Sequence, residues 1–268
     1  MRIRRFTTAG IGLLAAAAFG LAGCEGSGAP SGAASPSATA SSAADPAAAA
    51  ELATAVNKLG SESFSFTTVS GDQDNVSGTL DPVAGVGRVT VKVASATPSP
   101  GISADLEMRL VDKDMYLMLG QGVLPGVGGG WLHLDGARLP NGNQFGLRPG
   151  GKDPAGTARV LQTATDVRRG HTGIYTGTLD LSRLDRTDGA LGTQVLDQLG
   201  DGADRVPFQA TLDDQGRLTE LKLTLTAQTG GRDFVTRYSD YGAPVDVSRP
   251  DGDVTEAPAA VYTLLGGN

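Results

Sequence analysis

Residues 206–226, VPFQATLDDQGRLTELKLTLT, hold two runs in which apolar and polar side chains alternate. A period of two is typical of β-strands that bury one face and expose the other. Between the runs, the segment 213–216 (DDQG) is built from turn-forming residues. The stretch therefore predicts an antiparallel hairpin. Its apolar positions are Phe208, Ala210, Leu212, Leu221, Leu223 and Leu225.

The same alternation recurs along most of the chain and predicts about ten strands. Besides the hairpin, the expected strands cover residues 62–69, 76–81, 88–93, 104–110, 115–119, 131–135, 173–181 and 233–240. Helical spacing is confined to about three segments, which cover residues 47–59, 153–167 and 188–199. The first two helices begin with Asp followed by Pro, a typical helix start. We expect an α+β fold: a curved antiparallel half-barrel with the helices over its concave apolar face.

The first 23 residues have the composition of a secretory signal peptide. Three arginines lie within the first five residues, and an apolar run from Ala9 to Ala22 follows. This run is shorter than the ~20 residues that a spanning helix needs. The only cysteine, Cys24, comes next, in Leu21-Ala22-Gly23-Cys24, which resembles the lipobox of bacterial lipoproteins. The resemblance implies cleavage before Cys24 and a diacylglyceryl group on its thiol.

Residues 24–44 are built from Gly, Ser, Ala, Pro and Thr and predict a flexible tether. Residues 45–268 then form a single expected domain. The chain carries a formal net charge of −7, and loss of the signal peptide, with its three arginines, makes the rest more negative. Because an acidic surface repels nucleic acid, we expect none as a partner.

Six motifs, in this order and spacing, resemble the LppX/LprA/LprF/LprG lipoproteins of actinobacteria, over roughly residues 50–250 plus the lipobox. The resemblance implies a fold similar to the periplasmic lipoprotein carriers (LolA-like), with a hydrophobic cavity for acyl chains. It also implies a role in carrying or presenting lipid or glycolipid at the envelope. The motifs are DMYLMLG (114–120), GWLHLD (130–135), DPAG (153–156), YTGTLDL (175–181), VPFQATLD (206–213) and YSDYGAPV (238–245).

Apolar residues on faces that the helices would cover are candidates for the cavity wall, although a residue on such a face is more often ordinary core than ligand wall. The strand 115–119 is apolar on both faces and is the best single candidate. Gly-rich loops at 120–130 and 136–152 are candidate gates. The cavity candidates are Leu106, Met108, Met115, Leu117, Leu119, Leu161, Leu196, Leu221 and Leu223.

Catalytic patterns are missing from the sequence. It has no Gly-x-Ser-x-Gly motif, and its one cysteine is assigned to the anchor. His133 and His171 are the only histidines and do not belong to a cluster with metal-ligand spacing. We therefore expect that the protein is not an enzyme and that it holds no metal or cofactor. We also expect a monomer on the extracytoplasmic face of the cell membrane. Two alternatives stay open: an interaction module that docks an envelope transporter or sensor, and, with less support, a cell-wall hydrolase.

Overall fold

The computed structural model describes residues 44–70, 73–92, 105–119, 129–139, 147–185, 193–227 and 230–265. All of them belong to one compact unit, residues 42–268. The predictions for the signal peptide, for Cys24 and for nearly all of the tether lie outside the described residues.

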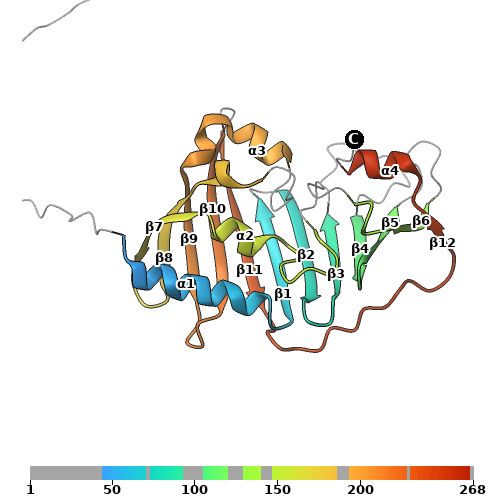
Figure 1. Cartoon of the computed structure of the whole chain (residues 1–268), viewed down its shortest axis with the longest axis horizontal. Coiled ribbons are helices and arrows are strands. Elements are labelled where there is room, and N and C mark those ends of the chain that lie inside the picture. Colours follow the sequence, from blue (N-terminus) through green and yellow to red (C-terminus); the bar gives the residue numbers. More distant parts are fainter. Residues whose placement is uncertain are drawn as a thin grey trace, which may run out of the picture. The chain divides into compact units, whose positions relative to one another are not determined.

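Twelve strands form one curved, unclosed sheet (Figure 1). Its strand order is β12-β6-β5-β4-β3-β2-β1-β11-β10-β9-β8-β7. The strands are β1 (Phe64–Ser70), β2 (Gln73–Asp81), β3 (Val86–Lys92), β4 (Asp105–Val111), β5 (Asp114–Leu119), β6 (Gly130–Leu134), β7 (Ala164–Arg169), β8 (Ile174–Leu179), β9 (Val206–Leu212), β10 (Leu218–Ala227), β11 (Gly230–Ser239) and β12 (Val254–Glu256).

Two antiparallel meanders make up this sheet. Strands β1 to β6 form the first and β7 to β11 the second, and β11 pairs with β1 to join them. The hairpin predicted from residues 206–226 is β9 and β10, with Phe208 opposite Leu223. The α+β class with a curved antiparallel sheet is confirmed. The expected ten strands all form, and the two further strands are β7 and β12. Strand β12 pairs in parallel with β6.

Strand β7 corrects the prediction of a helix over residues 153–167. The helix there, α2, spans only Thr157–Leu161, and β7 begins at Ala164. Asp153 lies before the helix but still caps it, because its carboxylate accepts hydrogen bonds from the backbone N–H groups of Ala158 and Arg159. The β-branched residues that follow Leu161 favour a strand over a helix.

The other helices are α1 (Pro46–Leu59), α3 (Thr193–Leu199) and α4 (Ala259–Leu264), with short 3₁₀ helices at Leu181–Arg183 and Gly200–Asp204. Helix α1 forms as predicted, and the Asp45 side chain accepts a hydrogen bond from the N–H of Ala47. Residues 188–192 of the third predicted helix lie outside the described part. Helix α4 was not predicted.

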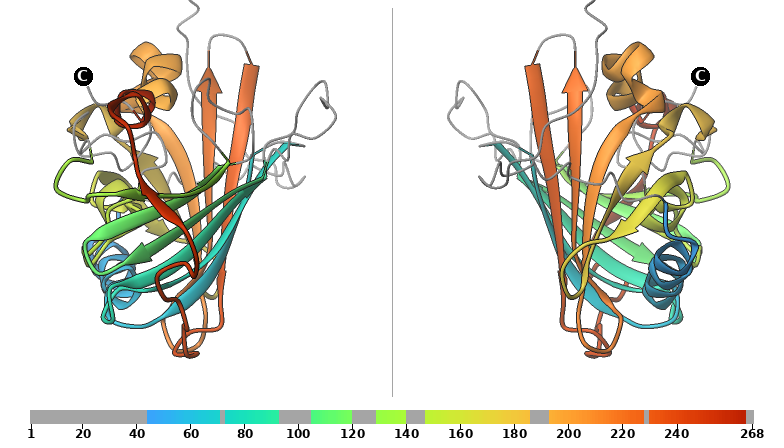
Figure 2. Two further views of the ribbon diagram at one scale, coloured as in Figure 1. Left: turned by 90° about the vertical axis from the view of Figure 1, so that its right-hand side faces the viewer. Right: turned by 90° about the vertical axis from the view of Figure 1, so that its left-hand side faces the viewer.

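Helices α1, α2 and α3 lie against the half of the sheet that contains β7 to β11, whereas α4 lies at the end that contains β4 to β6 (Figure 1). Seen from its two ends, the curved sheet has the helices on one side (Figure 2). One continuous core lies between these layers, and helix α1 contributes Ala48, Leu52, Val56 and Leu59 to it. Side chains on the opposite face of the sheet are mostly polar, as the alternation predicted.

Candidate functional site

The space between the sheet and its covering helices contains an apolar cavity of about 330 Å³, which we call the first lobe. It extends from β1 and β11 across β2 and β3 to β4. Most of its wall is aliphatic or aromatic. The lining residues are Phe66, Thr68, Val76, Val89, Val91, Met108, Leu147, Ala155, Thr157, Thr236 and Tyr238.

A second apolar cavity of about 170 Å³, the second lobe, adjoins the first. It extends the opposite way, toward β10 and helices α2 and α3. The two lobes share Thr68, Ala155, Thr157, Thr236 and Tyr238 as a common wall. The remaining residues of the second lobe are Val160, Val195, Leu221, Leu223, Leu225 and Phe234.

Hydroxyl groups are concentrated in this common wall, and they are paired. The Thr68 and Thr236 hydroxyls lie 2.9 Å apart across β1 and β11. The Tyr238 hydroxyl lies 3.1 Å from Oγ1 of Thr157, the first residue of helix α2. Burial raises the pKa of Tyr238, so its phenol keeps its proton at neutral pH. Because each hydroxyl has a partner, the lobes present no unsatisfied hydroxyl to an apolar ligand.

A cross-strand contact shapes the sheet side of the first lobe. Phe66 in β1 lies opposite Gly78 in β2, and its ring covers the glycine. A Cβ atom at residue 78 would lie 2.8 Å from that ring and 2.5 Å from the carbonyl oxygen of Arg88. Only glycine fits at this position, and the phenyl ring that covers it becomes part of the cavity wall.

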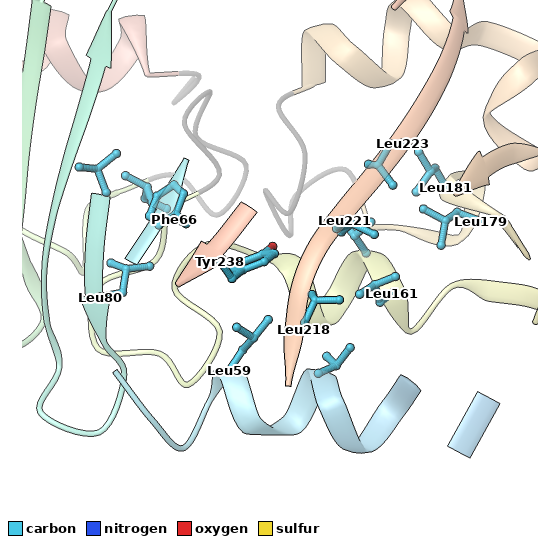
Figure 3. Packing of buried hydrophobic residues seen from close by; sticks show 14 of the residues in the cluster. Leu59, Phe66, Leu80, Leu161, Leu179, Leu181, Leu218, Leu221, Leu223 and Tyr238 are labelled. Carbon is cyan, nitrogen blue, oxygen red and sulfur yellow. The ribbon is translucent and has the colours of Figure 1, made fainter. Parts of the chain in front are cut away.

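The nine predicted cavity residues separate into two groups. Met108 lines the first lobe, while Leu221 and Leu223 line the second. Figure 3 shows Leu221 and Leu223 on the same strand, β10. The other six pack in or against the surrounding core and line neither lobe: Leu106, Met115, Leu117, Leu119, Leu161 and Leu196. Strand β5, which is apolar on both faces, lies away from the common wall in the strand order, and its apolar side chains are buried in the core.

Most residues that line the first lobe were not among the cavity candidates predicted from the sequence. Val89 and Val91 were recognised as the apolar face of a strand, but that face was not assigned to the cavity. Phe66 and Tyr238 lie on strands that were predicted without an assigned face. The alternation of Phe64, Phe66 and Thr68 in β1 is the sequence pattern that could have indicated this part of the cavity wall. Much of both candidate gate loops lies outside the described residues.

A polar hollow of about 420 Å³ lies on the opposite face of the sheet, over β7 to β10. Its lining includes Arg168, Gln209 and Lys222, and its only carboxylate among the described residues is Asp166. Glycoside hydrolysis uses a pair of carboxyl groups. The hollow therefore gives the hydrolase alternative no support.

His133 lies on β6 between two carboxylates, Asp114 of β5 and Glu256 of β12. Its Nδ1 is 2.7 Å from Glu256 Oε1, and its Nε2 is 3.2 Å from Asp114 Oδ2. Burial by itself would lower the pKa of His133, but these two partners outweigh it and raise the pKa. The described residues contain no group of three or more His, Cys, Asp or Glu that could hold a metal ion.

Within the described ranges, no helix is long and apolar enough to cross a membrane. No protein-family model and no curated protein matches the chain. Among solved structures, the chain is similar to LprF from Mycobacterium bovis, with a TM-score of 0.51 and 18% sequence identity. The match covers 79% of this chain and 100% of that one. The chain therefore has the fold of LprF, in agreement with the resemblance that its motifs predicted.

Proposed function

We propose that this protein is an extracytoplasmic lipoprotein, held at the cell membrane by an acylated Cys24, that binds an acylated lipid or glycolipid and carries or presents it. The observation that supports this most directly is the first lobe. It is an apolar cavity of about 330 Å³ in a chain with the fold of LprF. That volume falls within the usual range of small-ligand sites.

The chemistry of the lobe matches an acyl chain. Val76, Val89, Val91 and Met108 offer methyl and thioether surface, and the hydroxyls of the common wall bond to one another. Binding would be driven by burial of apolar surface, at about 25 cal/mol per Å². Val76 and Val91 are only half-buried, so the lobe reaches the surface on the side of β2 and β3. A polar headgroup can remain outside at that side.

The cavity also favours a carrier over an interaction module. A protein that used the sheet only as a docking scaffold would gain nothing from open space in its interior, because each empty volume weakens packing. Tyr238 and Thr157, whose hydroxyls bond to each other in the common wall, lie between the first lobe and the second. A cavity that costs stability is expected where a ligand fills it.

A pair of substitutions in β3 tests the proposal. Val91 lines the first lobe, whereas its neighbour Thr90 points to the opposite face of the sheet. Val91→Trp should displace about two methylenes of ligand and weaken fatty-acid binding at least about tenfold. Thr90→Trp adds the same bulk outside the lobe and should bind as the unmodified protein does.

The measurement uses residues 42–268, the compact unit, exported by an actinobacterial host. Native mass spectrometry with lipid extraction reports any co-purifying lipid, and uptake of a fluorescent fatty acid reports affinity. A lipid adduct that disappears in Val91→Trp but persists in Thr90→Trp supports the proposal. A clean protein mass together with no fatty-acid uptake in the unmodified unit would contradict it and favour the interaction module.

A further inference from the structure

Of the five residues that form the common wall of the two lobes, Tyr238 is the only aromatic one, and its side chain is joined to the covering layer. Tyr238 projects from β11, in the middle of the sheet, and is only 6% exposed. Figure 3 shows its ring between Phe66 and Leu80 on one side and Leu221 and Leu161 on the other. Phe66 lines the first lobe and Leu221 lines the second. Tyr238 therefore stands across the line that joins the lobes.

Contacts at both ends hold this ring in place. At its base, the ring packs edge-on against Phe64 of β1, with centroids 5.8 Å apart. At its tip, the hydroxyl bonds to Thr157, which begins helix α2. The side chain is thus fixed to the sheet and to the covering helix at once. A ring fixed at both ends blocks the passage more completely than a free aliphatic side chain would.

The space beyond the ring is apolar and suits the same ligand chemistry. Leu221, Leu223 and Leu225 of β10 line it, with Val160 of α2 and Val195 of α3. Its volume, about 170 Å³, would extend the first lobe of about 330 Å³ by half if the wall were absent. An acyl chain that fills the first lobe could then continue into the second, where every lining residue beyond the common wall is apolar.

We propose that Tyr238 is the end wall of the acyl-chain site and sets the longest chain that the protein buries completely. This inference rests on the proposed function, since it takes the first lobe to be the lipid site. Tyr238 determines specificity through its ring, while Thr157 positions that ring. Chains longer than the first lobe leave their excess methylenes in water.

A graded series of saturated fatty acids measures the length limit. Each methylene that enters the lobe should tighten binding about fourfold, and affinity should stop rising once the lobe is full. In Tyr238→Leu the ring is gone, so the plateau should move to longer chains. Tyr238→Phe keeps the ring and loses only the hydroxyl, so its plateau should stay at the original chain length. Thermal unfolding by circular dichroism confirms that both variants are folded.

A double variant locates the extra space. Leu223 lines only the second lobe. Adding Leu223→Trp to Tyr238→Leu should take up part of that lobe and shift the plateau back toward its original chain length. A plateau that stays at the same length in folded Tyr238→Leu, or one that Leu223→Trp does not shorten, would overturn the assignment.

A second measurement needs no substitution and decides the matter if Tyr238→Leu does not fold. A fatty acid with a photoreactive diazirine at its methyl end is bound to the unmodified unit and cross-linked, and the labelled peptides are mapped by mass spectrometry. Label on the first-lobe residues, Tyr238 and Thr157 included, supports the end wall. Label on residues 221–225 shows that the chain passes Tyr238 and refutes it. If no fatty acid binds at all, the proposed function itself fails.

Discussion

Gly177 in β8 lies opposite Phe208 in β9, and the phenyl ring fills the space above the glycine. A Cβ atom at residue 177 would lie 2.7 Å from the ring and 2.9 Å from the carbonyl oxygen of Thr165. Gly177→Ala should therefore lower the free energy of unfolding by about 1–3 kcal/mol through overpacking. Urea unfolding monitored by circular dichroism measures the change.

Gly231 in β11 provides the matched control for this residue. A Cβ atom there would meet only the carbonyl oxygen of Leu225, at an ordinary 3.6 Å. Gly231→Ala should leave stability unchanged or raise it slightly, because alanine restricts the unfolded chain. Equal losses in the two variants would mean that the ring over Gly177 does not matter.

Strand β12 is a short element that contacts β6 through backbone pairing and through one titratable side chain. It pairs in parallel with β6, and His133 of β6 bonds to its Glu256. Because the folded-state pKa of His133 is raised above 6.5, its pairing with the carboxylates stabilises the fold below that pH. The stabilisation is lost as the pH rises through the folded-state pKa.

His133→Gln should accordingly reduce the free energy of unfolding most at about pH 5 to 6, and the difference should shrink toward pH 8. Denaturant unfolding of both proteins across this range checks the expectation. Glu256→Gln removes the shorter of the two contacts and should flatten the dependence in part. His171→Gln, at an exposed turn, serves as the control. A gap that widened with rising pH would contradict the assigned role of His133.

At the scale of the whole molecule, the pairing of β1 with β11 joins the two meanders into one sheet over one core. We expect the unit 42–268 to unfold as a single cooperative unit. Trp131, the only tryptophan, lies in β6 near one end of the sheet, and helix α1 lies near the other. Fluorescence of Trp131 and far-ultraviolet circular dichroism should therefore report the same denaturation midpoint. Two separated transitions would show that the meanders unfold independently.

Local patterns in the sequence were sufficient for most of the elements. Alternation identified most of the ten strands because each of those buries one face, and Asp45-Pro46 marked the start of α1 because capping is a local interaction. Strand β7 was missed because the helical spacing of apolar residues runs through Leu161, at the end of α2, to the start of the strand. Strand β12 was missed because its three residues are all exposed and carry no alternation of burial.

The sequence by itself determined the antiparallel, one-sided character of the sheet, and it contains the lipobox-like motif at Cys24, since both depend on residues close together in the chain. Only the tertiary structure decided which apolar residues line a cavity. Leu117 and Met108 follow the same pattern and pair across β4 and β5, yet only Met108 lines the first lobe. The difference arises because β4 lies one strand nearer to the common wall than β5 does, and the first lobe ends at β4. Tyr238 is held in the common wall by a hydrogen bond to Thr157, which lies 81 positions away in the chain.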